Sequence, residues 1–63
     1  MPTNPTDVTR STILVVEPDI LFRIAIAEYF RECCYGVLQA ATADDAAALL
    51  GSKQNIDVIF AEL

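Results

Sequence analysis

The chain has 63 residues, and nine carboxylates against four Lys and Arg side chains give it a formal net charge of −5. A single domain of this size buries only about 60% of the surface that its unfolded chain exposes, so little surplus stability is expected. The acidic balance argues against nucleic acid as a partner of this segment, because few cations are present to displace counterions from a phosphate backbone.

Residues 1–11 contain two prolines and several Thr and Asn side chains, which predicts a flexible N-terminal tail. The folded part, residues 12–63, opens with a continuous aliphatic and β-branched run over 12–16, typical of a parallel strand covered on both faces. Pro18 ends this strand, and Asp19 is placed to cap the helix that follows.

Two apolar stripes run along this predicted helix. The stripe expected to face the core consists of Phe22, Ile26, Tyr29, Phe30 and Cys33. The stripe on the other side consists of Ile20, Ile24 and Ala27. The second stripe is either a docking surface for a partner protein or a face covered by neighbouring elements of a longer chain. Arg23 and Arg31 are expected to be solvated.

Two further strands and a second helix follow. Tyr35-Gly36 is expected to break the first helix before a short strand over 37–40, and a third apolar strand is predicted over 56–61. Between these strands lies a helix with Thr42 as its N-cap, acids in its first turn and Gly51 at its end.

The element order β-α-β-α-β predicts an α/β fold. Right-handed crossovers place the first strand in the middle of a partial doubly wound, flavodoxin-like parallel sheet with strand order 2-1-3. The first and third strands each run into a carboxylate, Glu17 and Glu62. Because parallel strands carry their chemistry at their carboxyl ends, these acids are expected to meet in one pocket, with Asp19 nearby. The alternative is that all three are solvated or cap a helix.

Five segments follow one another in register over residues 12–63. They are Ile13-Leu14-Val15-Val16-Glu17, the helix through Tyr29-Phe30, Tyr35-Gly36-Val37-Leu38-Gln39-Ala40-Ala41, Asp44-Asp45-Ala46, and Ile56-Asp57-Val58-Ile59-Phe60-Ala61-Glu62. Together they resemble the amino-terminal half of the receiver domain of bacterial response regulators. In that family an acidic pair after the first strand binds Mg²⁺, and an Asp that ends the third strand accepts a phosphoryl group from a kinase histidine.

The chain departs from this pattern at two of the three acidic positions. The resemblance places Glu17 at the first acid, Pro18 at the second and Glu62 at the phosphoacceptor. Glu17 and Asp19 are then the remaining candidates for a Mg²⁺ site. The site is expected to be weak, because Mg²⁺ demands near-ideal octahedral geometry and Asp19 is displaced by one position. The extra methylene of Glu62 moves its carboxylate outward by about 1.5 Å, and phosphoryl transfer depends on positioning. Phosphorylation is therefore expected to be impaired.

The resemblance implies a non-enzymatic signalling role in a two-component phosphorelay, with a histidine kinase or phosphotransfer protein as partner. The first helix would present Ile20, Ile24 and Ala27 to that partner. The alternative is a free-standing interaction module that dimerises or docks through the open edge of its third strand, or by domain swapping.

Two cysteines and the absence of targeting signals bear on location. No signal peptide and no apolar stretch long enough to span a bilayer is present, which predicts a cytoplasmic protein without a membrane partner. Cys33 and Cys34 are adjacent and close no useful loop, so reduced thiols are expected. By the same resemblance, Cys34 stands where the family commonly has Gly in a left-handed backbone conformation.

Overall fold

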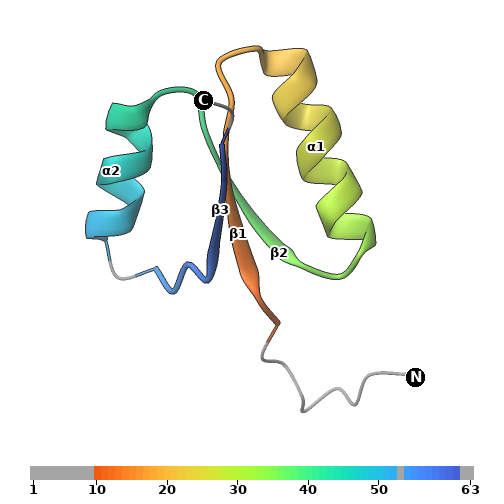
Figure 1. Ribbon diagram of the computed structural model, residues 1–63. Helices are drawn as coiled ribbons and strands as arrows, with labels where there is room; N and C mark the ends of the chain where they lie inside the picture. Colours follow the sequence, from red (N-terminus) through yellow and green to blue (C-terminus); the bar gives the residue numbers. More distant parts are fainter. Residues whose placement is uncertain (1–9, 53, 62–63) are drawn as a thin grey trace.

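The computed structural model describes residues 10–52 and 54–61. Its strands are β1 (Thr12–Val16), β2 (Gly36–Ala40) and β3 (Val58–Ala61). Its helices are α1 (Ile20–Glu32) and α2 (Ala43–Gly51). The strands form one parallel sheet in the order β2-β1-β3, and the two helices cover its opposite faces (Figure 1). The predicted α/β fold, with its partial doubly wound sheet, is confirmed.

The core lies around the central strand β1. Leu14 and Val16 of β1 belong to a cluster on the α2 side that includes Ala40 and Ala46. Because successive side chains of a strand point to opposite faces, Ile13 and Val15 face α1. Ala27 of α1 is fully buried there.

Both helices begin at the predicted caps. The Asp19 Oδ1 atom accepts hydrogen bonds from the backbone N–H groups of Leu21 at 3.0 Å and Phe22 at 3.1 Å. The Thr42 hydroxyl oxygen accepts one from the N–H of Asp45 at 3.1 Å. Each side chain thus satisfies backbone donors that have no partner inside the helix.

The carboxyl end of α1 is closed by Cys34, which has a φ of 71°. The N–H of Tyr35 bonds to the carbonyl of Phe30 at 3.0 Å, and the N–H of Cys34 bonds to that of Arg31 at 2.9 Å. These two hydrogen bonds form a Schellman motif. The Phe30 and Tyr35 rings pack edge to face across it, with their centroids 5.9 Å apart. The left-handed conformation expected at Cys34 is confirmed, whereas Gly36 lies inside β2 and is not the helix breaker.

The predicted buried face of α1 is correct only for Ile26 and Phe30, which are half-buried. Phe22, Tyr29 and Cys33 are exposed, and the stripe that faces the sheet is centred on Ala27, with Arg23 and Phe30 half-buried beside it. An alanine at the centre of the contact lets the helix backbone approach β1 and β2 closely, which turns the larger aromatic side chains toward the margin of the narrow sheet.

The third strand is shorter and more exposed than predicted. It begins at Val58 rather than at residue 56, and all four of its residues are exposed because it is an edge strand over which neither α1 nor α2 lies. Asp57 ties its start to β1: the Asp57 N–H donates to the Thr12 carbonyl at 2.9 Å, and Asp57 Oδ2 accepts from the Thr12 N–H at 2.8 Å. The strand is therefore anchored at its beginning by backbone and side chain together.

Candidate functional site

Glu17 stands at the carboxyl end of β1, where the sequence places the acidic pocket. Its backbone N–H donates to the Ala40 carbonyl at 3.0 Å, which extends the pairing of β1 with β2 by one residue. Its side chain is only 8% exposed, and its Oε2 atom accepts a hydrogen bond from the Asp19 N–H at 3.0 Å. The carboxylate is therefore held at the rim of the sheet.

Asp19 lies two residues further on, but its carboxylate serves the helix. Oδ1 accepts both capping bonds of α1, as predicted for a cap. A cation that drew this carboxylate toward Glu17 would have to compete with those bonds. Asp19 is therefore a poorly placed substitute for the side-chain oxygen that Pro18 lacks.

Glu17 also borders an apolar groove between α1 and β3. The groove encloses about 350 Å³ and is lined by Glu17, Phe22, Ile26, Phe60 and Ala61. It continues along α1 into a second apolar hollow. The Phe30 and Phe60 rings meet edge to face at 5.6 Å within this region. The groove thus offers one buried carboxylate among hydrocarbon and aromatic surfaces.

The predicted partner acid, Glu62, lies outside the described residues. The last described pair of β1 and β3 is Val16 opposite Ala61, so the two strands end in register. Within residues 10–52 and 54–61, no group of three His, Cys, Asp or Glu side chains is arranged to hold a metal ion. The Mg²⁺ site at Glu17 and Asp19 and the phosphoacceptor role of Glu62 stay predictions.

The predicted docking stripe is only partly on the surface. Ile20 is 57% exposed and Ile24 is 42% exposed, whereas Ala27 is fully buried. Ala27 must be removed from the stripe, because it forms the contact of α1 with the sheet. The docking role of Ile20 and Ile24 stays a prediction.

Arg23 is a site residue that the sequence analysis missed. Its Nη1 atom donates to the Glu17 carbonyl at 2.8 Å, and its Nε atom donates to the Gln39 side-chain oxygen at 3.3 Å. It therefore links α1 to the ends of β1 and β2. Its position four residues before Ala27, on the same helical face, is the sequence signal that could have identified it.

No helix of the described part of the chain is long and apolar enough to cross a membrane. None of the protein-family models, curated proteins or solved structures compared with the chain matches it.

Proposed function

We propose that the chain is a receiver-like signalling domain of a two-component phosphorelay, corresponding to the amino-terminal half of a receiver and acting in the cytoplasm without enzymatic activity of its own. Its partner is a histidine kinase or a phosphotransfer protein. Mg²⁺-dependent aspartyl phosphorylation is impaired in this domain, because Glu62 stands at the acceptor position and Pro18 replaces one metal-site acid.

The observation that carries this proposal is the layout of the sheet. A parallel β2-β1-β3 sheet puts the ends of β1 and β3 side by side, and Val16 is paired with Ala61. The residues that follow these two positions are Glu17 and Glu62. In-register ends of adjacent parallel strands support a shared rim for both acids.

The bonding of Glu17 and Asp19 supports the impairment. Glu17 has one oxygen engaged by a backbone N–H, and Asp19 is committed to the cap of α1. With Pro18 between them, the carboxylate set that would neutralise charge during phosphoryl transfer is incomplete. The domain then signals through binding, and exposed Ile20 and Ile24 at the start of α1 supply its contact surface.

The test of this proposal restores the two aspartates of the family pattern at positions 18 and 62. Isothermal titration calorimetry with Mg²⁺ compares the natural chain with the double variant Pro18→Asp, Glu62→Asp. We expect measurably tighter Mg²⁺ binding by the double variant, because it regains the two aspartates of the family pattern. A matched control, Pro18→Ala with Glu62→Gln, should gain nothing. Equal affinity in all three chains would contradict the proposed site.

The impairment has its own test. The natural chain is incubated with Mg²⁺ and a small-molecule phosphodonor, and its intact mass is measured. We expect the unmodified mass. A stable phosphoryl adduct on Glu62 would show that the acceptor position is functional and the impairment wrong.

A second candidate function rests on the exposure of β3. Val58, Ile59 and Phe60 are all large, apolar and at least two-fifths exposed, and among the described strands β3 has a neighbour, β1, on one side only. Such an edge favours pairing with another strand. We propose as the alternative that the chain is an interaction module that dimerises or docks through this edge.

Light scattering separates the two candidates. If β3 pairs with a second copy, the natural chain is dimeric at high concentration, and Ile59→Lys makes it monomeric. Ile24→Lys is the control for added charge on an exposed position away from the edge, and it should leave the dimer intact. A monomer at all concentrations contradicts dimerisation through β3.

A further inference from the structure

The outer edge of β2 is the second border of the sheet that no described strand covers. The Gly36 N–H donates to the Ser11 carbonyl at 2.9 Å, and the Ala40 carbonyl accepts from Glu17 at 3.0 Å, so Gly36 and Ala40 turn their backbone groups toward β1. In a parallel strand this orientation alternates from one residue to the next. Val37 and Gln39 therefore direct their N–H and C=O groups away from the sheet.

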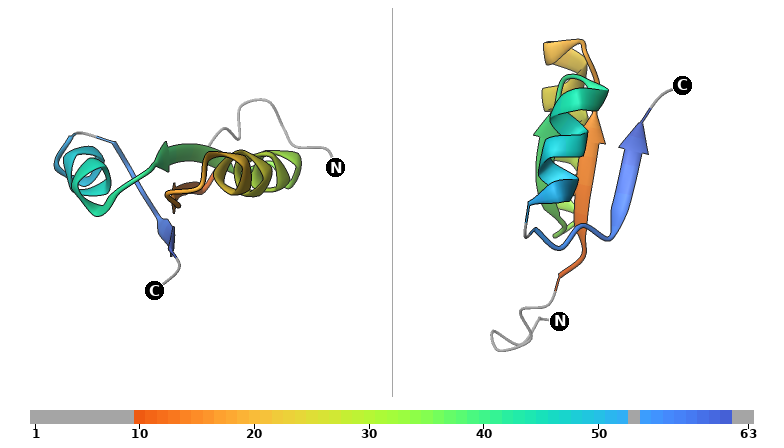
Figure 2. Two further views of the ribbon diagram at one scale, coloured as in Figure 1. Left: turned by 90° about the horizontal axis from the view of Figure 1, so that it is seen from above. Right: turned by 90° about the vertical axis from the view of Figure 1, so that its left-hand side faces the viewer.

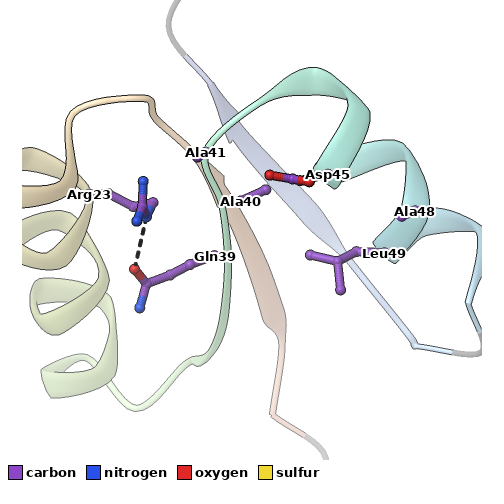
Figure 3. A pocket seen from close by; sticks show the side chains of 7 residues that line it. All are labelled: Arg23, Gln39, Ala40, Ala41, Asp45, Ala48 and Leu49. Atoms are coloured by element: carbon purple, nitrogen blue, oxygen red, sulfur yellow. Dashed lines mark hydrogen bonds between the residues drawn. The ribbon is translucent and has the colours of Figure 1, made fainter.

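Of these two residues, Gln39 borders a groove between the two helices. The groove encloses about 470 Å³, with Arg23 and Gln39 on the α1 side of β2 and Asp45 and Leu49 on the α2 side (Figure 3). Seen from above, β2 lies between α1 and α2, and no other described element borders its outer side (Figure 2). An added strand would therefore lie beside β2 at the edge of the sheet, next to the groove between α1 and α2.

The two walls carry opposite charges. Toward residues 10–52 and 54–61, Arg23 uses two of its five N–H donors, and both acceptors, the Glu17 carbonyl and the Gln39 side-chain amide, are neutral. These described contacts leave three donors and the positive charge of Arg23 for a ligand. Asp45 is exposed in the first turn of α2, on the opposite side of β2. Charge complementarity thus favours an acid on one face of a bound strand and a base on the other.

We infer that the outer edge of β2 binds an extended segment of a partner protein as an added strand, with an acidic side chain against Arg23 and an adjacent basic side chain against Asp45. Successive residues of a strand point to opposite faces, so an acid and a base that are neighbours in sequence reach the two walls simultaneously. Backbone hydrogen bonds to Val37 and Gln39 supply affinity that does not depend on the register of the bound strand. The charged pair fixes that register.

A second copy of this chain is not the occupant that fits. The three strands TILVV, GVLQA and VIFA contain no charged residue. Paired through any of these strands, a second copy would leave Arg23 and Asp45 without a charged partner from the added strand. The β2 edge is thereby distinguished from the β3 edge, whose exposed side chains are all apolar.

The test uses a fluorescent eight-residue peptide of alternating threonine and valine with adjacent glutamate and lysine at its centre. Its binding to the full 63-residue chain is followed by fluorescence anisotropy. We expect saturable binding, and a loss of about tenfold in affinity for Arg23→Gln, the lower range for a charge-assisted hydrogen bond. Replacing the peptide glutamate by glutamine should weaken binding to the natural chain by a similar factor.

Two further variants separate binding from folding. Asp45→Lys should weaken binding of the original peptide and should allow binding of a second peptide in which glutamate replaces the lysine. A folding defect would not produce this exchange of preference. Val37→Pro removes an outward N–H without touching the bonds to β1, so it should reduce binding while circular dichroism stays unchanged. Ile59→Thr, on the opposite edge, should bind normally.

Three outcomes overturn the inference. They are the absence of saturable binding to the natural chain, equal affinity for the glutamate and glutamine peptides, and failure of the Asp45→Lys charge exchange in a chain that circular dichroism shows to be folded. If Ile59→Thr abolishes binding while Val37→Pro does not, the peptide occupies the β3 edge instead.

Discussion

Cys34 holds the end of α1 in a conformation that its own side chain disfavours. Its φ of 71° lies in the left-handed region, where a Cβ atom crowds the backbone carbonyl. The Schellman bonds of Cys34 and Tyr35 use backbone atoms only, so a glycine at position 34 would keep them. The strain therefore comes from the side chain of Cys34, and glycine at this position would remove it without loss of the backbone hydrogen bonds.

Cys34→Gly should raise the free energy of unfolding by about 1 kcal/mol, because glycine adopts this conformation without steric penalty. Urea unfolding followed by circular dichroism measures the change. The control is Cys33→Gly, at a φ of −85°, which should destabilise the chain instead. If Cys34→Gly were no more stable than Cys34→Ala, the backbone would not be strained.

Single residues whose role depends on sequence neighbours were predictable. Asp19 and Thr42 were identified as caps because the bonds they make span two or three residues. Ala27 and Arg23 were misplaced, because their surroundings depend on how closely α1 approaches the sheet. The local pattern favoured the larger apolar stripe of the same helix as the buried face.

At the scale of elements, β3 pairs with β1 along its whole length, and Asp57 adds an anchor at its start. The two bonds between Asp57 and Thr12 close a small ring there, whereas the other border of β3 has no described neighbour. Asp57 was seen in the sequence only as part of a strand. Its bonding partner is 45 positions away, so local patterns carried no sign of it.

Asp57→Ala should lower the free energy of unfolding by about 1 kcal/mol, since it leaves the Thr12 N–H without its side-chain acceptor. Hydrogen exchange measured by NMR should accelerate at Thr12 and along β3 before it does so in α2. Asp57→Asn keeps a side-chain oxygen and serves as the matched control. Uniform acceleration over the whole chain would show that Asp57 does not act locally on β3.

The order and type of all five elements followed from the sequence, because strand and helix periodicities are local. Their exposure did not. The run over 56–61 has the composition of a strand covered on both faces, yet β3 borders the sheet and all four of its residues are exposed. Composition describes what a strand can bury, and topology decides what it does bury.

At the scale of the whole molecule, the buried core is small. The buried hydrophobic residues of the described part are Ile13, Leu14, Val15, Ala27, Ala40 and Ala46. Half of them are alanines, which bury little apolar surface each. The fold therefore depends on a few aliphatic side chains of β1.

Leu14→Ala should remove a large part of the chain's free energy of unfolding. Such a substitution costs about 2–5 kcal/mol in a packed core, and a domain of 63 residues has roughly 3–9 kcal/mol in all. Loss of the far-ultraviolet circular dichroism signal measures the result. Ile24→Ala, on the exposed side of α1, is the control and should stay folded; a cooperative, native-like melt of Leu14→Ala would contradict the importance of β1.

The sheet topology was predictable at this scale because right-handed crossovers leave few arrangements for β-α-β-α-β. The site was predictable only up to Glu17 at the end of β1. Its bonds to Asp19 and, through the backbone, to Arg23 arise from the turn between β1 and α1, whose geometry the sequence pattern does not specify.

The central position of β1 gives the described sheet two separate borders, and the two proposed edge contacts would make the molecule bivalent. With strands spaced at about 4.8 Å, the outer borders of β2 and β3 face away from each other roughly 10 Å apart. The border of β2 lies beside Arg23 and Asp45, whereas the side chains of β3 are all apolar, so the two proposed contacts would select different ligands. With both contacts formed, one continuous sheet would join two partner proteins across β1, which neither partner would touch.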